Sequence, residues 1–195
     1  MTDLLSSPGA AVAFALLSWW LGTGVILWLV RRPPASFAWS LQALSLLFVL
    51  GLWAARESMQ GSGTGPAFLG FASVILMWSW HEMAFLSGWL TGPRRGPMTP
   101  GVRGLARFGQ GLGVVLYHEL ALLANFALLA WLQQGRPNHV ALCTFALLWC
   151  MRLSAKLNLF FGVPQNGAQY LPAHLKYLAS YFRTRDMTLW FVLSM

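Results

Sequence analysis

Long apolar runs separated by short polar breaks make up most of the chain. Five of these runs have about 20 residues, enough for an α-helix to cross the ~30 Å hydrocarbon layer of a membrane. Clusters of proline, glycine and arginine stand between the runs. The pattern predicts an all-α integral membrane protein with a single membrane domain, residues 1–195. We expect spans at about 10–30, 37–54, 67–90, 111–132 and 139–161.

The chain after the fifth run follows a different pattern. Between residues 171 and 185, apolar side chains recur at helical spacing and basic side chains lie opposite them. This predicts an amphipathic helix at about 171–185 that lies in the membrane interface. The last apolar run, 187–195, is too short to span, so we expect a truncated end, a re-entrant end or one packed on a partner. Five basic residues are predicted to contact lipid headgroups: Arg94, Arg95, Lys176, Arg183 and Arg185.

Composition supports the membrane assignment and excludes several classes of function. Hydrophobic residues make up 57% of the chain and charged residues 9%, which is outside the usual range of soluble domains. The net charge of +8 comes from basic residues at the ends of apolar runs, so no soluble basic face is present to bind nucleic acid. The first run lacks a basic region before it and is too long for a signal peptide, so we expect a retained span.

The distribution of basic residues predicts the orientation. The loops after the first and third runs and the tail after the fifth are rich in arginine and lysine, and the other two loops are not. Because positively charged loops stay in the cytoplasm, we expect a periplasmic N-terminus and a cytoplasmic C-terminal segment in a bacterial membrane. Cys143 and Cys150 lie on one face of a single helix, so we expect no disulfide and no zinc site, only small buried hydrophobic side chains.

Two of the five acidic residues, Glu82 and Glu119, lie inside predicted spans, each directly after a histidine. A rise of ~1.5 Å per residue places both His-Glu pairs ~10–14 Å below the same membrane surface, and Arg152 falls in that layer. We therefore expect Arg152 to neutralise both carboxylates, with the two histidines bridging them. The predicted intramembrane polar cluster is His81, Glu82, His118, Glu119, Arg152 and Lys156, walled by Trp78, Trp80, Phe85, Tyr117 and Trp149.

Four interpretations of this cluster stay open on the sequence alone. Buried ion pairs often fix helix packing and nothing else. His81 and His118 are also candidate axial ligands of a pigment or haem, because neutral imidazole among aromatic residues suits a macrocycle metal. A catalytic metal site is disfavoured, since adjacent His and Glu diverge by ~100° on a helix. A proton route lacks a further acidic residue towards the outer face. We predict no catalytic residue and no resident metal.

Four stretches of the sequence resemble the PuhE family of photosynthetic complex assembly proteins. They are FLSGWLTGPRR (85–95), LYHELAL (116–122), MRLSAKLNLFFGV (151–163) and LPAHLKYLASYFRTRDM (171–187). The last two are long and unusual, and the resemblance covers most of the chain from the first span onward. It implies a protein of the cytoplasmic, photosynthetic membrane of purple-type phototrophic bacteria, linked to building the reaction centre and its light-harvesting ring.

From these observations we expect a non-enzymatic protein that assists assembly or stabilisation of the reaction centre and light-harvesting complex. Its expected partners are subunits of that complex and membrane lipids. Two alternatives remain: a permanent structural subunit of the complex, and a pigment or haem carrier or enzyme that uses the His-Glu layer. The sequence assigns no cofactor and leaves bacteriochlorophyll or carotenoid at protein interfaces open.

Overall fold

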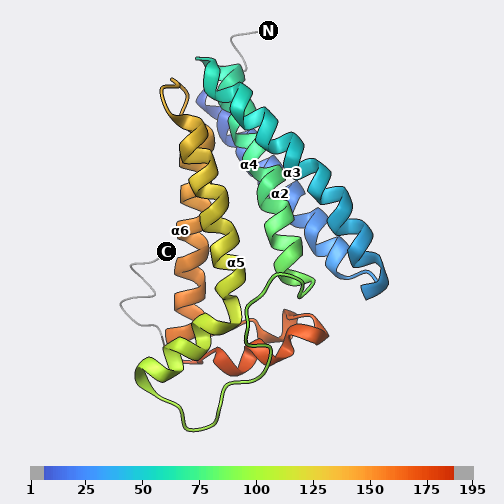
Figure 1. Cartoon of the computed structure of the whole chain (residues 1–195), viewed down its shortest axis with the longest axis vertical. Coiled ribbons are helices and arrows are strands. Elements are labelled where there is room, and N and C mark those ends of the chain that lie inside the picture. The colour runs from blue at the N-terminus through green and yellow to red at the C-terminus, as the bar shows by residue number, and fades with distance from the viewer. Residues whose placement is uncertain (1–6, 187–195) are drawn as a thin grey trace.

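The computed structural model describes residues 7–186, and in that range all regular structure is helical. Five helices are long and apolar enough to cross a membrane, which confirms the predicted all-α membrane fold. They run side by side as a bundle (Figure 1). The five helices are α2 (Pro8–Val30), α3 (Phe37–Gln60), α4 (Thr64–Leu86), α5 (Gly104–Gln133) and α6 (Val140–Phe161). Three 3₁₀ segments accompany them: η1 (Pro34–Ser36), η2 (Ala168–Tyr170) and η3 (Ala173–Tyr181). The short final run, 187–195, lies outside the described residues.

Local sequence explains where the helices begin and end. The Ser7 hydroxyl accepts a hydrogen bond from the Ala10 N–H at 3.2 Å, and Pro8 occupies the first turn of α2. Gly88 has a φ of +79° and stops α4 at Leu86, earlier than the predicted residue 90. Helix α5 begins at Gly104 instead of near residue 111, so Arg107 belongs to a helix and not to the preceding loop.

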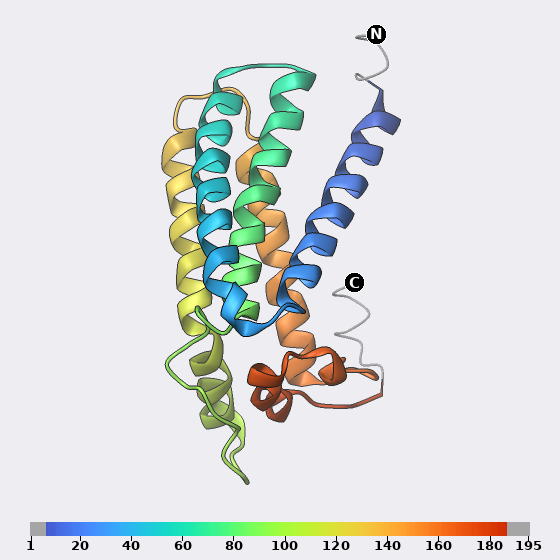
Figure 2. The ribbon, with the colours of Figure 1, turned by 90° about the vertical axis from the view of Figure 1, so that its right-hand side faces the viewer.

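Helix α4 lies at the centre of the bundle and is the most buried of the five. Small residues let its backbone approach its neighbours. A Cβ on Gly51 of α3 would lie 2.8 Å from the Ser73 carbonyl oxygen, and one on Gly70 would lie 3.3 Å from the Ala141 amide nitrogen. Close backbone approach of this kind drives helix association in lipid, where apolar burial alone gives little. Helix α2 lies on the outer side of α4 and is tilted relative to the rest (Figure 2).

Helix α5 is bent part-way along its length (Figure 1). The loop after α4 contacts it there through its backbone. The Arg94 N–H donates to the Gly113 carbonyl at 3.1 Å, and the His118 N–H donates to the Thr91 carbonyl at 3.0 Å. Gly92 lies between these contacts, and a Cβ on it would clash with the Gly113 carbonyl. A helix bends where groups from another segment insert into its backbone hydrogen bonds, as the peptide groups of this loop do in α5.

The C-terminal segment crosses one end of the bundle (Figures 1 and 2). The predicted amphipathic α-helix at 171–185 is in fact a 3₁₀ helix over Ala173–Tyr181. Side chains three residues apart align in a 3₁₀ helix. Leu175, Leu178 and Tyr181 therefore share one face, and all three are buried against Phe85 and Val114. The segment thus packs on protein through that face.

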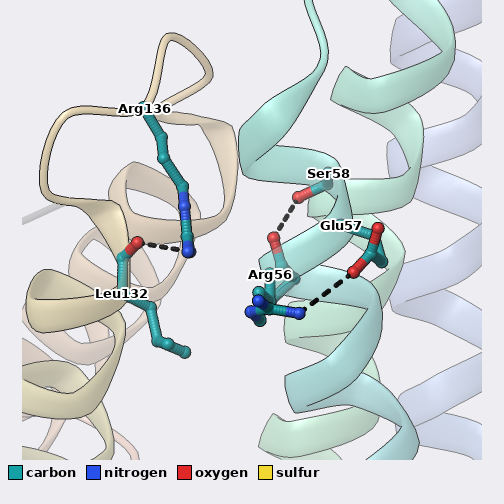
Figure 3. A network of polar contacts seen from close by, with 6 residues as sticks. Arg56, Glu57, Ser58, Leu132 and Arg136 are labelled. Atoms are coloured by element: carbon teal, nitrogen blue, oxygen red, sulfur yellow. Dashed lines mark hydrogen bonds and ion pairs between the residues drawn. The ribbon is translucent and has the colours of Figure 1, made fainter.

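The opposite end of the bundle has short-range polar contacts (Figure 3). Arg56 pairs with its neighbour Glu57 at 3.4 Å, and both side chains are exposed. Arg136 donates to the Leu132 carbonyl at 2.6 Å and so caps the end of α5. The Asn138 side chain accepts from the Val140 N–H at 3.0 Å and donates to the Ser58 carbonyl at 2.9 Å, which joins the start of α6 to α3.

Candidate functional site

The predicted polar cluster comes from three helices, two residues from each. Helix α4 supplies His81 and Glu82, α5 supplies His118 and Glu119, and α6 supplies Arg152 and Lys156. Adjacent residues on a helix point about 100° apart. The two histidines therefore face the interior, with exposed fractions of 2% and 0%, while the two glutamates face the side of α6.

The glutamates form two separate ion pairs with α6. Arg152 Nη1 lies 2.5 Å from Glu82 Oε1, and Lys156 Nζ contacts Glu119 Oε1. The second carboxylate oxygen of Glu119 accepts from Trp149 Nε1 at 3.0 Å. The two cations stand four residues apart, on one face of α6, so a single helix neutralises carboxylates from two others.

The histidines form a second, interior cluster. His81 Nε2 is 3.1 Å from Asn125 Oδ1, and the Asn125 amide nitrogen is 3.7 Å from the Met77 sulfur. The rings of His81 and His118 meet edge to face with centroids 6.2 Å apart. Neither nitrogen of the His118 ring has a hydrogen-bond partner within residues 7–186. The interior cluster thus combines aromatic ring contacts with two hydrogen bonds of Asn125.

Phe85 separates the histidines from the charges. Its ring lies 4.8 Å from that of His118, and the cationic groups of Arg152 and Lys156 lie 5.4 and 5.2 Å from its centroid. Cations within about 6 Å of an aromatic face are attracted to it, and more strongly away from water. Phe85 therefore supports both cations while keeping the imidazoles apart from them.

Each ion pair faces its own cavity. Glu82 and Arg152 line a cavity of about 350 Å³ between α2, α4 and α6, the α2-side cavity. Glu119 and Lys156 line a cavity of about 400 Å³ between α5, α6 and the C-terminal segment, the α5-side cavity. Arg152 also reaches the second cavity, so it stands between the two. Neither histidine lines either cavity.

Several expectations about the cluster need correction. The structure gives Arg152 only one of the two glutamates as an ion-pair partner, and Lys156 takes the other. The histidines do not bridge the carboxylates, because Phe85 and the helix geometry turn them inward. Tyr117 is 46% exposed and points away from the layer. Cys143 and Cys150 are free, as expected, but lie exposed on the outer face of α6 instead of buried.

The predicted headgroup-contacting residues differ in their surroundings. Arg95, Lys176 and Arg185 are exposed. Arg94 is engaged within the protein: its Nε donates to the Tyr181 hydroxyl at 2.7 Å, and its Nη2 donates to the Pro97 carbonyl at 2.9 Å. Arg183 is half-buried, and its backbone N–H donates to the Leu159 carbonyl at 3.0 Å. Two of the five therefore anchor the C-terminal segment to the bundle.

Sequence reasoning missed two residues of structural weight, Arg107 and Asn125. Arg107 is 5% exposed, and its Nη2 donates at 2.9 Å to the carbonyls of both Phe160 and Tyr181. Its guanidinium also stacks 3.7 Å from the Phe160 ring centroid. The spacing of these residues in the sequence could have indicated their role, because positions 107, 118 and 125 lie on one face of a helix with 3.6 residues per turn. The sequence pattern therefore predicts a polar stripe on the face of this helix that points to the core.

The described part of the chain, residues 7–186, contains no group of three or more His, Cys, Asp or Glu side chains arranged to hold a metal ion. Both glutamates of the layer are paired with cations of α6, so neither carboxylate is without a partner. The arrangement is suited to joining helices and to presenting hydrogen-bond donors at the ends of two apolar cavities.

Comparison with known proteins finds one family and one curated relative. Residues 5–195 match the profile of a family described as "Protein of unknown function (DUF3623)". A Rhodobacter capsulatus protein, described as an uncharacterized 30.4 kDa protein in the puhA 5′ region, is 37% identical over 194 residues. The match covers 97% of this chain and 71% of that protein. No solved structure matches the chain.

Proposed function

We propose that this chain, which belongs to the DUF3623 family, assists assembly or stabilisation of the photosynthetic reaction centre and light-harvesting complex. The observation that carries this proposal is the relative in the puhA 5′ region, 37% identical over nearly the whole chain. It agrees in gene region with the PuhE resemblance of the four quoted stretches. The proposed partners are subunits of that complex, together with membrane lipids.

The geometry of the polar layer favours a non-enzymatic role. Its two carboxylates are each paired with a cation from α6, and its two histidines are packed among aromatic rings. A catalytic base needs a free acceptor within reach of a substrate proton; both carboxylates accept from cations, and the histidines line neither cavity. A polar layer of this kind fixes the positions of three helices relative to one another. A fixed arrangement of helices suits a protein that acts by binding partner subunits.

The proposed location is the cytoplasmic, photosynthetic membrane, with the N-terminus in the periplasm. The arginine-rich loop between α4 and α5 and the C-terminal segment lie at one end of the bundle, as the positive-inside rule requires of cytoplasmic segments (Figure 1). Gly96 is at an open position of that loop, with nothing within 4 Å of an added Cβ, whereas Gly101 has a φ of +79° that disfavours a side chain. We expect Gly96→Cys to resist a membrane-impermeant thiol reagent in intact cells, and its labelling would contradict this orientation.

Deletion of the gene in its phototrophic host tests the proposal. We expect less assembled reaction centre and light-harvesting complex, measured from membrane absorption spectra and native gels, with pigment synthesis largely intact. Complementation with the unchanged gene and with an Arg56→Ala variant, which alters only an exposed pair, should restore the complex equally.

Two observations, one in the deletion strain and one in the unmodified strain, would contradict a transient assembly role. Loss of bacteriochlorophyll with accumulation of its precursors would indicate an enzyme of pigment synthesis. Recovery of the chain in fixed stoichiometry with the purified mature complex would indicate a permanent subunit. An absorption spectrum of the chain purified in mild detergent adds a third check, since a bound pigment or haem would favour a carrier.

A further inference from the structure

The α5-side cavity has the build of a small-molecule site. Its volume of about 400 Å³ falls within the ~300–1,000 Å³ typical of ligand pockets. The walls are apolar side chains of α5 and α6, and the rings of Phe85 and Phe160 contribute flat surfaces. Leu171, Leu178 and Phe182 of the C-terminal segment close one end. Both Phe160 and the C-terminal segment are held in place by Arg107.

Charged groups lie at the other end, and their charges cancel. Lys156 and Arg152 are cations, and Glu119 and Glu82 are the carboxylates paired with them. A ligand with a net charge would unbalance this group in an environment where unpaired charge is costly. An uncharged ligand leaves the balance intact.

Lys156 has spare hydrogen-bond donors at that end. A lysine ammonium has three N–H donors, and within residues 7–186 Lys156 uses one, towards Glu119. Each oxygen of Glu119 accepts one hydrogen bond, from Lys156 and from Trp149, so the carboxylate is engaged with two donors of α6. A ligand atom entering this end therefore meets a donor, and an acceptor such as a carbonyl oxygen is its natural complement.

The direction of the cavity also matters. Its polar end is at Glu119, which lies fifteen residues (119 − 104) into α5 from Gly104, while its closed apolar end is at the C-terminal segment. Glu119 therefore lies beyond the bend of α5, in the part of the helix that runs within the bundle and away from the end that the C-terminal segment covers. A phospholipid has the reverse polarity, because its ester carbonyls and headgroup stay at the membrane surface.

From these observations we propose that the α5-side cavity binds an uncharged, lipid-soluble molecule with a ring carbonyl, that is, a molecule of quinone-like chemistry. The carbonyl oxygen accepts a hydrogen bond from Lys156 Nζ, and the ring lies between the aromatic side chains. The apolar tail follows the wall of α5 and α6 towards lipid. This site is independent of the proposed assembly role, and a binding assay on the purified chain tests it separately.

The test is equilibrium dialysis of the detergent-purified full chain with decylubiquinone, quantified by ultraviolet absorbance after extraction. We expect saturable binding. Decylbenzene, with the same tail and no carbonyl, and palmitate, with a carboxylate, should each compete at least roughly tenfold more weakly. Equal competition by decylbenzene would overturn the carbonyl contact, and stronger competition by palmitate would overturn the uncharged ligand. Displacement of decylubiquinone by phosphatidylglycerol at equal concentration would show that the cavity is a phospholipid-binding site and would overturn the proposal.

Two sets of variants locate the binding site. Leu157 lines the cavity and Leu147 is on the outer face of the same helix, so Leu157→Trp should abolish binding and Leu147→Trp should leave it unchanged. The charge-balanced double variant Lys156→Met with Glu119→Gln should weaken binding roughly tenfold. Helicity by circular dichroism checks that each variant folds. Unchanged binding by Leu157→Trp would place the ligand elsewhere and overturn the proposal, whether or not the double variant folds.

Discussion

At the end of the bundle near Arg56 and Arg136, the charged side chains hydrogen-bond, within residues 7–186, only with residues near them in sequence, and the uncharged Asn138 makes the side-chain contact between helices. In the half of the bundle near η3, Glu82 and Glu119 instead pair with cations from a different helix, in partly buried surroundings. Both regions contain ion pairs, yet their burial and chain separation differ. The comparison teaches that depth and the number of helices joined decide how much an ion pair contributes to this fold.

The largest effect should come from breaking a deep pair. Arg152→Met leaves the Glu82 carboxylate without its partner, at a cost of roughly 3–5 kcal/mol. Thermal unfolding of the detergent-purified protein measures this. Adding Glu82→Gln should restore much of the loss, because a neutral amide tolerates the site better. Adding Glu119→Gln should not, because that carboxylate belongs to Lys156. Equal rescue by both glutamine changes would mean that the four charges act as one network.

A somewhat smaller effect is expected at the arginine that joins α5 to the C-terminal segment. Arg107→Met removes hydrogen bonds to two backbone carbonyls and the stacking on Phe160, which should cost about 2–3 kcal/mol. Limited proteolysis should then cut between residues 162 and 186 first. Arg103→Met, four residues earlier and outside these contacts, is the matched control. Equal protease resistance of both variants would contradict the anchoring role.

The bend in α5 depends on a glycine in the preceding loop. Gly92→Ala places a methyl group against the Gly113 carbonyl and should cost about 1–3 kcal/mol. Gly96→Ala, in the same loop with open space around it, should have little effect. Thermal unfolding again provides the measurement. A Gly92→Ala protein as stable as Gly96→Ala would show that the loop does not need its close approach to α5.

The smallest effect is expected at the exposed pair. Arg56→Ala should change stability by about 0–1 kcal/mol, since exposed ion pairs contribute little. The same thermal assay applies. A loss as large as that of Arg152→Met would remove the contrast between the two regions.

Much of the fold was predictable because lipid constrains it strongly. Runs of apolar residues with arginine and proline at their ends placed all five spans, and matching depth placed His81 near His118. The choice of ion partner was not predictable from depth alone. Arg152 and Lys156 share a face of α6, and only the relative rotation of α4 and α5 assigns each glutamate to its cation.

Other features depend on contacts that are distant in sequence. The bend of α5 needs the peptide groups of Thr91 and Arg94 at particular positions, which no periodicity encodes. The C-terminal segment combines apolar spacings of three and four residues, and its docking under Phe85 and Val114 favours the three-residue repeat of a 3₁₀ helix. The roles of Arg107 and Asn125 were accessible in principle, since both follow the His118 face of α5.

The order of the ion-pair partners along the chain has a consequence for biogenesis. Both carboxylates are carried by α4 and α5, which leave the ribosome before α6 brings either cation. During insertion, the hairpin of α4 and α5 therefore carries unneutralised glutamates, and its transfer into lipid costs more than that of the finished bundle. We therefore expect the α4–α5 hairpin to leave the insertion machinery only after α6 supplies Arg152 and Lys156, so that insertion of α6 completes integration of these five helices.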